Sequence, residues 1–181
     1  MKNRYINRCA QGAARYILLS VDGTDFRIRE PKPFWKGWFS FKFRSAGLRY
    51  EVALCIQTGD ICWTNGPFPC GAWPDINIFR KDLKGKLKRG EKVEADFGYR
   101  GEKSCIRTPA DHGNNERRMK MKSRVRARQE HVNKRFKQFN CLKQVWRHQR
   151  NNHQDAFQAV VVVTQLVMGN GKPLWQPKCN Y

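Results

Sequence analysis

Short apolar runs in the first part of the chain alternate with polar residues and stop at turn-forming residues, which is the pattern of β-strands. Residues 14–29 (ARYILLSVDGTDFRIR) predict a strand that enters a turn at the Asp-Gly pair of residues 22–23. Residues 48–58 (LRYEVALCIQT) and 60–70 (DICWTNGPFPC) predict two more strands. The Thr-Gly-Asp link at residues 58–60 has the chemistry of a hairpin turn, so it should join these two strands directly.

A helical period replaces this alternation after Pro67, Pro69 and Gly71, which we expect to end the sheet region. Residues 73–87 (WPDINIFRKDLKGKL) place apolar side chains at helical spacing and predict a helix. Asp75 lies near the expected helix start, where a carboxylate meets the positive end of the helix dipole. Two further short strands are then predicted at residues 92–100 (KVEADFGYR) and 104–109 (SCIRTP).

The second half of the chain predicts helices of two kinds. Residues 115–129 show no apolar periodicity before Val125, which predicts an exposed basic loop or a frayed helix start. From Val125 the period is that of an amphipathic helix with one packed and one basic face, its apolar positions being Val132, Phe136, Phe139 and Leu142. Residues 156–168 (AFQAVVVVTQLVM) are apolar almost all round and predict a fully buried helix, although the four valines would also suit a buried strand.

This order of elements predicts an α/β layered domain. A length of 181 residues fits one domain over residues 1–181, and 40% hydrophobic residues are enough for a core. No stretch approaches the roughly 20 apolar residues that a membrane span needs. The seven cysteines include no C-x-x-C pair, which argues against structural zinc and against a disulfide framework.

The charge balance indicates a polyanionic partner. The chain has 36 Lys and Arg against 15 Asp and Glu, and 36 − 15 gives a net charge of +21. Residues 116–150 alone hold 13 Lys and Arg against two Glu, and 13 − 2 gives +11. Phosphate backbones are the commonest partner for such a charge, although an anionic membrane surface or an acidic protein would satisfy the same arithmetic.

Three carboxylates stand out in this cationic chain. Asp22 and Asp96 each end a predicted core strand, and Glu130 lies in the basic helix. Strand ends face the ligand cleft in open α/β sheets, and Mg²⁺ is bound through a few carboxylates together with substrate phosphates. Taken singly, each carboxylate has an ordinary explanation. Asp22 would be a turn former, Asp96 a strand-end cap, and Glu130 an i, i+4 partner of Arg126 and Lys134.

Four runs of the sequence resemble the catalytic domain of the Harbinger/PIF-like DDE transposases. The resemblance extends from about residue 17 to residue 173, and the separation 130 − 96 = 34 between its second and third acidic positions matches what such nucleases use. The runs are SVDGTDFRI at 20–28, the stretch from FKFRSAG to INIFR at 41–80, KVEADFGYRG at 92–101 and RVRARQEHVNKRFKQF at 124–139.

The resemblance implies a ribonuclease H-like fold, with a mixed sheet flanked by helices. It implies that Asp22, Asp96 and Glu130 are the catalytic residues and bind two divalent metal ions, Mg²⁺ or Mn²⁺. The implied activity is metal-dependent cleavage and joining of DNA phosphodiester bonds. Asp75 matches a further family aspartate, for which we expect a structural or supporting role. Asp25 is either an extra ligand or a cap of the turn after Asp22, and we favour the cap.

DNA is therefore the expected substrate, and the basic helix supplies the candidate contacts Arg124, Arg126, Arg128, Lys134 and Lys137. Relatives usually carry a longer N-terminal region with a helix-turn-helix-like part, and some have a Myb-like partner protein. Because 21 residues precede Asp22, we expect that DNA-binding region to be missing here. We expect a nuclear location, with the cytoplasm as the alternative. The alternative function is a domesticated or truncated copy that binds DNA or a protein without cutting.

Two features leave alternatives open. On a helical wheel, Glu130 falls roughly 150° from the apolar stripe, so it faces away from the sheet unless the stripe packs on the C-terminal helix or the helix begins near Glu130. A second feature is a stretch that interleaves aromatic and basic residues. This stretch predicts, with equal weight, either a DNA-binding surface or the core face of a strand. It comprises Trp35, Trp38, Phe39, Phe41 and Phe43 with Lys32, Lys36, Lys42 and Arg44.

Overall fold

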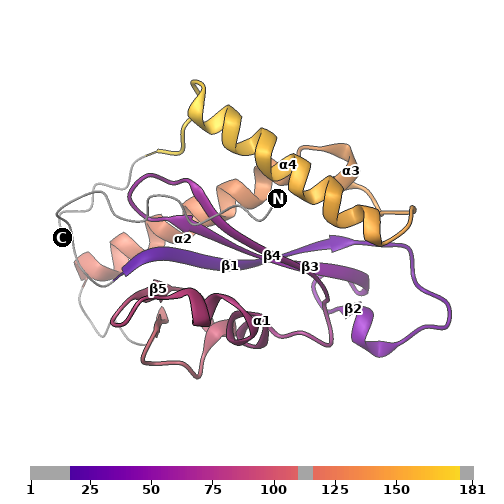
Figure 1. The fold of residues 1–181 in the computed structure, drawn as a ribbon, viewed down its shortest axis with the longest axis horizontal. Coiled ribbons are helices and arrows are strands. Elements are labelled where there is room, and N and C mark those ends of the chain that lie inside the picture. Colours follow the sequence, from indigo (N-terminus) through magenta and orange to yellow (C-terminus); the bar gives the residue numbers. More distant parts are fainter. Residues whose placement is uncertain (1–16, 110–115, 176–181) are drawn as a thin grey trace.

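A computed structural model of the chain describes residues 17–109 and 116–175, which form a six-stranded mixed sheet with helices on both faces (Figure 1). The strand order is β2-β3-β1-β5-β6, and β4 pairs with β3. β1 is antiparallel to β3 and parallel to β5, which in turn is parallel to β6. The strands are β1 (Ile17–Arg27), β2 (Phe39–Ser40), β3 (Ser45–Cys55), β4 (Ile61–Pro69), β5 (Lys92–Glu94) and β6 (Ile106–Arg107).

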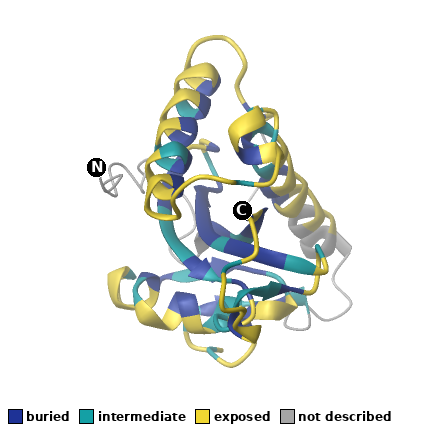
Figure 2. Ribbon diagram, turned by 90° about the vertical axis from the view of Figure 1, so that its right-hand side faces the viewer, coloured by how far each residue is buried: buried dark blue, intermediate teal, exposed yellow. Residues whose placement is uncertain are grey.

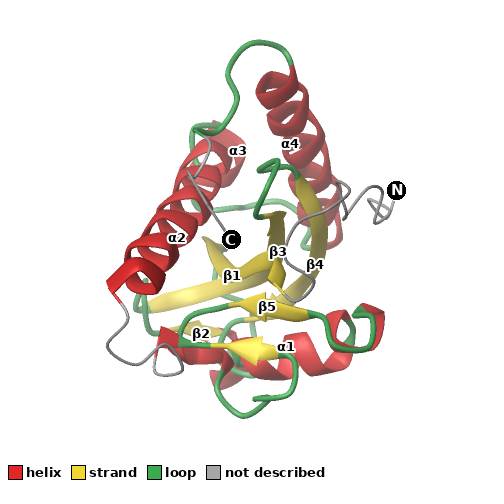
Figure 3. Ribbon diagram, turned by 90° about the vertical axis from the view of Figure 1, so that its left-hand side faces the viewer, coloured by secondary structure: helices red, strands yellow, loops and turns green. Residues whose placement is uncertain are grey.

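The helices divide between the two faces of the sheet. The long helices α2 and α4 cover one face, and α1 lies on the other (Figure 3). The helices are α1 (Asp75–Lys81), α2 (Glu116–Phe136), α3 (Asn140–Lys143) and α4 (Asn151–Gly169), with 3-10 helices at Lys36–Trp38, Leu83–Lys86 and Phe97–Tyr99. The expected α/β architecture, a mixed sheet flanked by helices, is confirmed.

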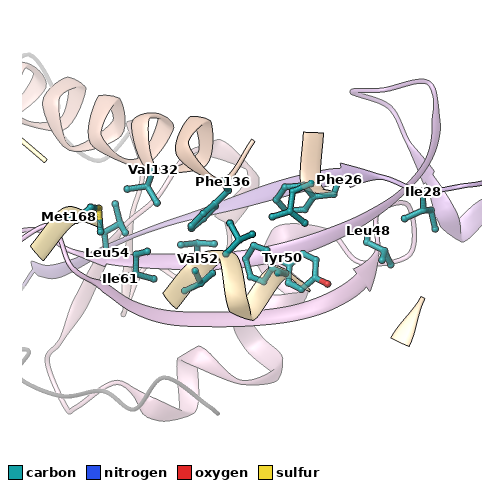
Figure 4. Close-up of a cluster of buried hydrophobic side chains, with 14 of the residues drawn as sticks. Phe26, Ile28, Leu48, Tyr50, Val52, Leu54, Ile61, Val132, Phe136 and Met168 are labelled. Carbon is teal, nitrogen blue, oxygen red and sulfur yellow. The ribbon is translucent and has the colours of Figure 1, made fainter. Parts of the chain in front are cut away.

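Each face of the sheet has its own hydrophobic core. On the side of α2 and α4, Phe26 and Tyr50 of the sheet pack with Phe136 and Phe157 of the helices, and the rings of Tyr50 and Phe157 stack 3.9 Å apart. Figure 4 shows this cluster between α2 and the strands. On the other side, Phe79 of α1 packs beneath the sheet in a second cluster. Both faces of the central strands are therefore buried, which fixes the strand register.

The expected turn at residues 22–23 does not exist, because β1 runs without a break from Ile17 to Arg27. Asp22 pairs with Val52 of β3 and Gly23 with Glu51, in the middle of the ladder. A Cβ atom on Gly23 would collide with the carboxylate of Asp75. The glycine therefore serves a close approach across the strand rather than a change of chain direction.

The other predicted strands are found. β3 and β4 form the expected hairpin, and Gly59 in its turn has a φ of 83° that favours glycine. β4 continues through Pro67 and ends at Pro69, within the predicted residues 60–70. Among the described strands β4 pairs with β3 alone, so its outer edge forms no ladder. Proline, which lacks an N–H group, is tolerated at such an edge because no ladder hydrogen bond is lost. β5 and β6 lie within residues 92–100 and 104–109 as predicted, although both are shorter.

Both C-terminal helices differ from the prediction in one respect. α2 begins at Glu116, nine residues before Val125, because Arg, Lys and Met are good helix formers without an apolar stripe. α4 is a helix as expected but is not fully buried, since Val161 is 0% exposed whereas Leu166 is 57% exposed. Figure 2 shows exposed outer faces on the helices around a buried sheet. No described helix is long and apolar enough to cross a bilayer.

Candidate active site

A cleft opens beside β1 at the point where β5 ends. The parallel ladder between the two strands stops with Ser20 opposite Glu94. Beyond this pair β1 continues along β3, while the chain after β5 turns into the 3-10 helix Phe97–Tyr99. The cleft has a volume of about 480 Å³ and is lined by β1, the turn before β3, the start of α1, the end of β5 and α2. Ligand sites of open α/β sheets lie at such carboxyl ends of parallel strands.

Asp22 is partly buried in this cleft, in the middle of β1. Its Oδ2 accepts a hydrogen bond from Nδ2 of Asn133 on α2, at 2.9 Å. Burial, followed by the negative charges of Asp96 and Asp75, raises the pKa of Asp22 from 3.8 to about 7. A carboxylate in these surroundings is stabilised in its charged form when a cation binds beside it.

Two glycines allow the carboxylates of Asp75 and Asp96 to approach each other and β1. A Cβ atom on Gly98 would lie 2.8 Å from Oδ2 of Asp75 and 3.1 Å from Oδ1 of Asp96. Asp96 Oδ1 accepts a hydrogen bond from the Gly98 amide at 2.8 Å, which fixes the carboxylate at the start of the 3-10 helix. Asp75 reaches β1 over Gly23. The carboxylates of Asp75 and Asp96 therefore lie close together, and both line the cleft together with Asp22.

Asp25 is not a turn cap, because it lies inside β1 and is 3% exposed. Its Oδ1 lies 2.7 Å from Nε of Arg49, and its Oδ2 accepts a hydrogen bond from the Ser40 hydroxyl at 2.9 Å. Burial would raise the pKa of Asp25, but the hydrogen bonds and charge of Arg49 hold it below its ordinary value. Arg49 also lies 3.3 Å from Oδ1 of Asp75. Asp25 and Arg49 thus form a buried ion pair that supports the cleft.

Burial by the fold also raises the pKa of Asp75, to about 6, although the charge of Arg49 opposes this effect. Asp75 is the first residue of α1, as its place before the predicted helix suggested. Asp75 lies next to Arg49 of the Asp25–Arg49 ion pair and also next to Asp96. The structure places this residue in the cleft itself, and its supporting role stays a prediction.

Glu130 lies at the rim of the cleft rather than among these carboxylates. Its side chain is 56% exposed, and Oε1 lies 3.4 Å from Nε of Arg126, one helical turn earlier. This is the i, i+4 ion pair named above as the ordinary explanation. The apolar stripe of α2 packs on both the sheet and α4, since Val132 is 0% exposed and the ring centroid of Phe136 lies 5.5 Å from that of Phe157. The first of the two alternatives is therefore met in part, whereas the second is wrong because α2 begins at Glu116. Glu130 nevertheless lines the cleft.

The carboxylates fit a hard divalent cation in their chemistry, because Mg²⁺ and Mn²⁺ prefer oxygen ligands. Burial first, and then the charges of Asp96 and Asp75, raise the pKa of Asp22, and a bound cation would oppose both effects. Within the part of the chain that the structure describes, no three acidic, His or Cys side chains are grouped closely enough to hold one ion. Asp22, Asp96 and Glu130 all line the cleft, but Glu130 is paired with Arg126 and the three do not form a closed group of ligands.

Two polar residues of α2 that the sequence analysis missed attach the helix to the sheet. Gln129 accepts a hydrogen bond from Ser20 at 3.0 Å and donates one to the Val52 carbonyl at 3.0 Å. Asn133, four residues later, donates to Asp22. Both lie within the apolar stripe between Val125 and Phe136 on the sequence. Polar residues on the packed face of an otherwise apolar stripe are the signal that could have identified them.

The candidate DNA contacts separate into exposed and buried residues. Arg124, Arg126 and Lys134 are exposed, and Lys137 is partly buried at the cleft. Burial, and then the charge of Lys42, lowers the pKa of Lys137. Arg128 is 2% exposed and donates a hydrogen bond to the Ile56 carbonyl, so its inclusion among the DNA contacts was wrong. Its position in the stripe with Val125 and Val132, by i+3 and i+4 spacing, could have shown this.

Comparison with known proteins supplies a family but no individual relative. The family model described as DDE superfamily endonuclease matches residues 21–166, which is more than half of the chain. No curated protein and no solved structure matches the chain. The matched residues include the cleft, its carboxylates and the basic helix, on the α/β fold of a mixed sheet flanked by helices. The chain therefore belongs to the DDE superfamily endonucleases.

Proposed function

We propose that this protein is the catalytic domain of a Harbinger/PIF-like transposase, a metal-dependent endonuclease that cleaves and joins DNA phosphodiester bonds. One observation carries the proposal: Asp22 in β1 and Asp96 just after β5 line the same cleft, whose rim is basic. Family membership supports a nuclease of this type. The nucleus remains the proposed location, because DNA is the proposed substrate.

The cationic side chains around the cleft would hold the DNA backbone. Lys42, Lys134 and Lys137 line the cleft beside the carboxylates, and Arg126 lies at its rim. Phosphate contacts of this kind position DNA without reading its sequence. The acidic centre would repel a phosphodiester by itself, so the surrounding positive charge is needed to bring the substrate to the carboxylates.

Asp22 and Asp96 would hold the first of two Mg²⁺ or Mn²⁺ ions, and Glu130 the second. When bound, such ions activate water or a 3′-hydroxyl and stabilise the leaving oxygen of a phosphodiester. Asn133 would orient the Asp22 carboxylate through its hydrogen bond. The Asp25–Arg49 ion pair would hold Asp75 in place beside them. Glu130 would exchange its contact with Arg126 for the ion when DNA neutralises that arginine.

One observation favours a second function, DNA binding without cutting. Glu130 is paired with Arg126 on the helix surface, and the described residues contain no closed group of metal ligands. A domesticated transposase copy would retain the basic rim and the fold without needing the third carboxylate in place. DNA cleavage distinguishes the two functions.

The proposal is tested by nicking of supercoiled plasmid in Mg²⁺ and in Mn²⁺. The wild-type protein should nick the plasmid, and Asp96→Asn should not, because it removes a charged ligand while keeping the shape of the side chain. Asp155→Asn is the matched control, since Asp155 is an exposed acid of α4 outside the cleft. DNA binding without nicking by the wild-type protein would establish the second function instead.

A further inference from the structure

The turn between β2 and β3 presents an exposed aromatic side chain next to a residue that lines the cleft. Phe41 is 82% exposed, more than any other large hydrophobic residue of the described chain. The next residue, Lys42, lines the cleft together with Asp22. The proposed function does not account for this ring. An exposed aromatic side chain one residue from an active-site cleft is placed to contact whatever the cleft binds.

The turn holds Phe41 outward by its own construction. The Phe43 amide donates a hydrogen bond to the Ser40 carbonyl at 3.2 Å, and Arg44 adopts the left-handed backbone conformation with a φ of 52°. Phe43 faces the molecule, where the guanidinium of Arg27 lies 4.9 Å from its ring centroid. A non-glycine residue in this conformation costs energy and occurs most often at functional sites.

The aromatic stretch is divided by the structure into packed and open rings. Trp35 covers the backbone of Gly37 and makes an edge contact with Trp38, with their ring centroids 6.2 Å apart. Phe39 and Phe43 are partly buried. Phe41 touches the ring of Phe39 at 5.3 Å between centroids, in an edge-on arrangement. Trp38, Phe39 and Phe43 are therefore partly buried, whereas Trp35 at 55% and Phe41 at 82% are exposed. Of the two exposed rings, Phe41 is the one next to Lys42, which lines the cleft.

The surrounding charge indicates the chemistry of the partner. Lys42 lies in the same turn, and Lys137 of α2 lies 5.9 Å from the centroid of the Phe43 ring. An exposed aromatic ring next to cations that line a cleft, here Lys42 and Lys137, is the combination that proteins use to bind single-stranded nucleic acid. A base within a duplex is already stacked on both faces, so the ring fits a base that has left the stack at a splayed or frayed end.

We propose that Phe41 stacks on an unpaired base of DNA bound in the cleft, with Lys42 contacting the adjoining phosphate. The inference rests on the proposed function, because it takes the substrate to be DNA. It adds that the protein recognises an unstacked DNA end of any base sequence. This end would lie beside the phosphodiester bond held at the carboxylates. Base stacking on an aromatic side chain tolerates any sequence because every base has a flat face.

Binding to tailed duplexes tests this inference without cleavage, in Ca²⁺ buffer. One duplex carries a short single-stranded thymine tail, and a second carries the same tail built from abasic nucleotides, which keeps the phosphates and removes the bases. Both tail polarities are measured. The wild-type protein should bind the thymine tail about 5- to 100-fold more tightly than the abasic tail, as expected for stacking. Phe41→Ala should lose this preference, and Phe41→Trp should keep it.

Trp175→Ala is the matched control, because Trp175 is 42% exposed and lies outside the cleft. It should retain the wild-type preference. Lys42→Gln should weaken binding to both tails equally. If Phe41→Ala prefers the thymine tail as strongly as the wild type, the inference is overturned, and the exposed ring belongs to a protein contact. Absence of DNA binding by the wild-type protein would overturn the proposed function as well.

Discussion

Replacing Asp22 by Asn should stabilise the metal-free protein at neutral pH and remove its stabilisation by metal. In the folded chain the pKa of Asp22 is raised from 3.8 to about 7, first by burial and then by Asp96 and Asp75. The unfolded chain ionises this group near pH 4 without that cost. The contribution of Asp22 to the free energy of unfolding is therefore largest below pH 4. This contribution is lost as the pH rises towards 7.

The size of the effect follows from the same values. A pKa raised from 3.8 to about 7 corresponds to an upper bound of about 4 kcal/mol in the free energy of unfolding. Because Asp22 is only partly buried and faces a hydrated cleft, we expect about 1–2 kcal/mol. An asparagine retains the oxygen that accepts the hydrogen bond from Asn133. Asp22→Asn should therefore exceed the wild type in stability at pH 8, and by less at pH 5.

Urea denaturation followed by circular dichroism, at both pH values, measures the difference. Addition of Mg²⁺ should reverse the order, because an ion at a hundredfold excess over its Kd adds about 2.7 kcal/mol to the wild type alone. Asp155→Asn should behave like the wild type throughout. If Asp22→Asn is less stable than the wild type at pH 8 without metal, the carboxylates are not crowded as described, and the reasoning fails.

Three further substitutions test other parts of the account. Val161→Asp should destabilise the fold by about 3 kcal/mol or more, whereas Val162→Asp, on the exposed side of α4, should change the urea midpoint little. Replacing Arg124 and Arg126 by Ala should reduce the magnitude of the log–log salt slope of DNA binding by about 2; an unchanged slope would remove both from the interface. Because its pKa is lowered, Asp25 stabilises the fold at neutral pH and loses this effect in acid. Asp25→Asn should thus cost about 1–3 kcal/mol at pH 7 and flatten the loss of stability in an acid titration; equal acid sensitivity would contradict the ion pair.

Periodicity and turn chemistry predicted most of the fold because they report local preferences. The β3–β4 hairpin, α1 and the helical α4 followed from patterns within a few residues of each other. The supposed turn at Gly23 was wrong because its cause is not local: the glycine accommodates Asp75, which is 52 residues away in sequence (75 − 23). A sequence pattern shows that a glycine is permissive and does not show which atom approaches it.

The site was predictable in part for the same reason. The family motif singled out Asp22 and Asp96, and the structure has Asp22 in β1 and Asp96 just after β5, the strand parallel to β1. The helical wheel correctly indicated that Glu130 points away from the packed stripe. Pairing of Asp25 with Arg49, and of Asn133 with Asp22, depends on the tertiary contact of separate elements and left no local signal. The catalytic roles of Asp22, Asp96 and Glu130 stay predictions.

Direct binding of Mn²⁺, measured by the electron paramagnetic resonance signal of the free ion during titration, tests the central claim most closely. The claim is that Asp22 and Asp96 together hold a divalent cation in the cleft. The wild-type protein and Asp155→Asn should both deplete free Mn²⁺, and Mg²⁺ should compete with it. Asp96→Asn should lose this binding while keeping the wild-type circular dichroism spectrum. Equal Mn²⁺ binding by Asp96→Asn and the wild type would contradict the account.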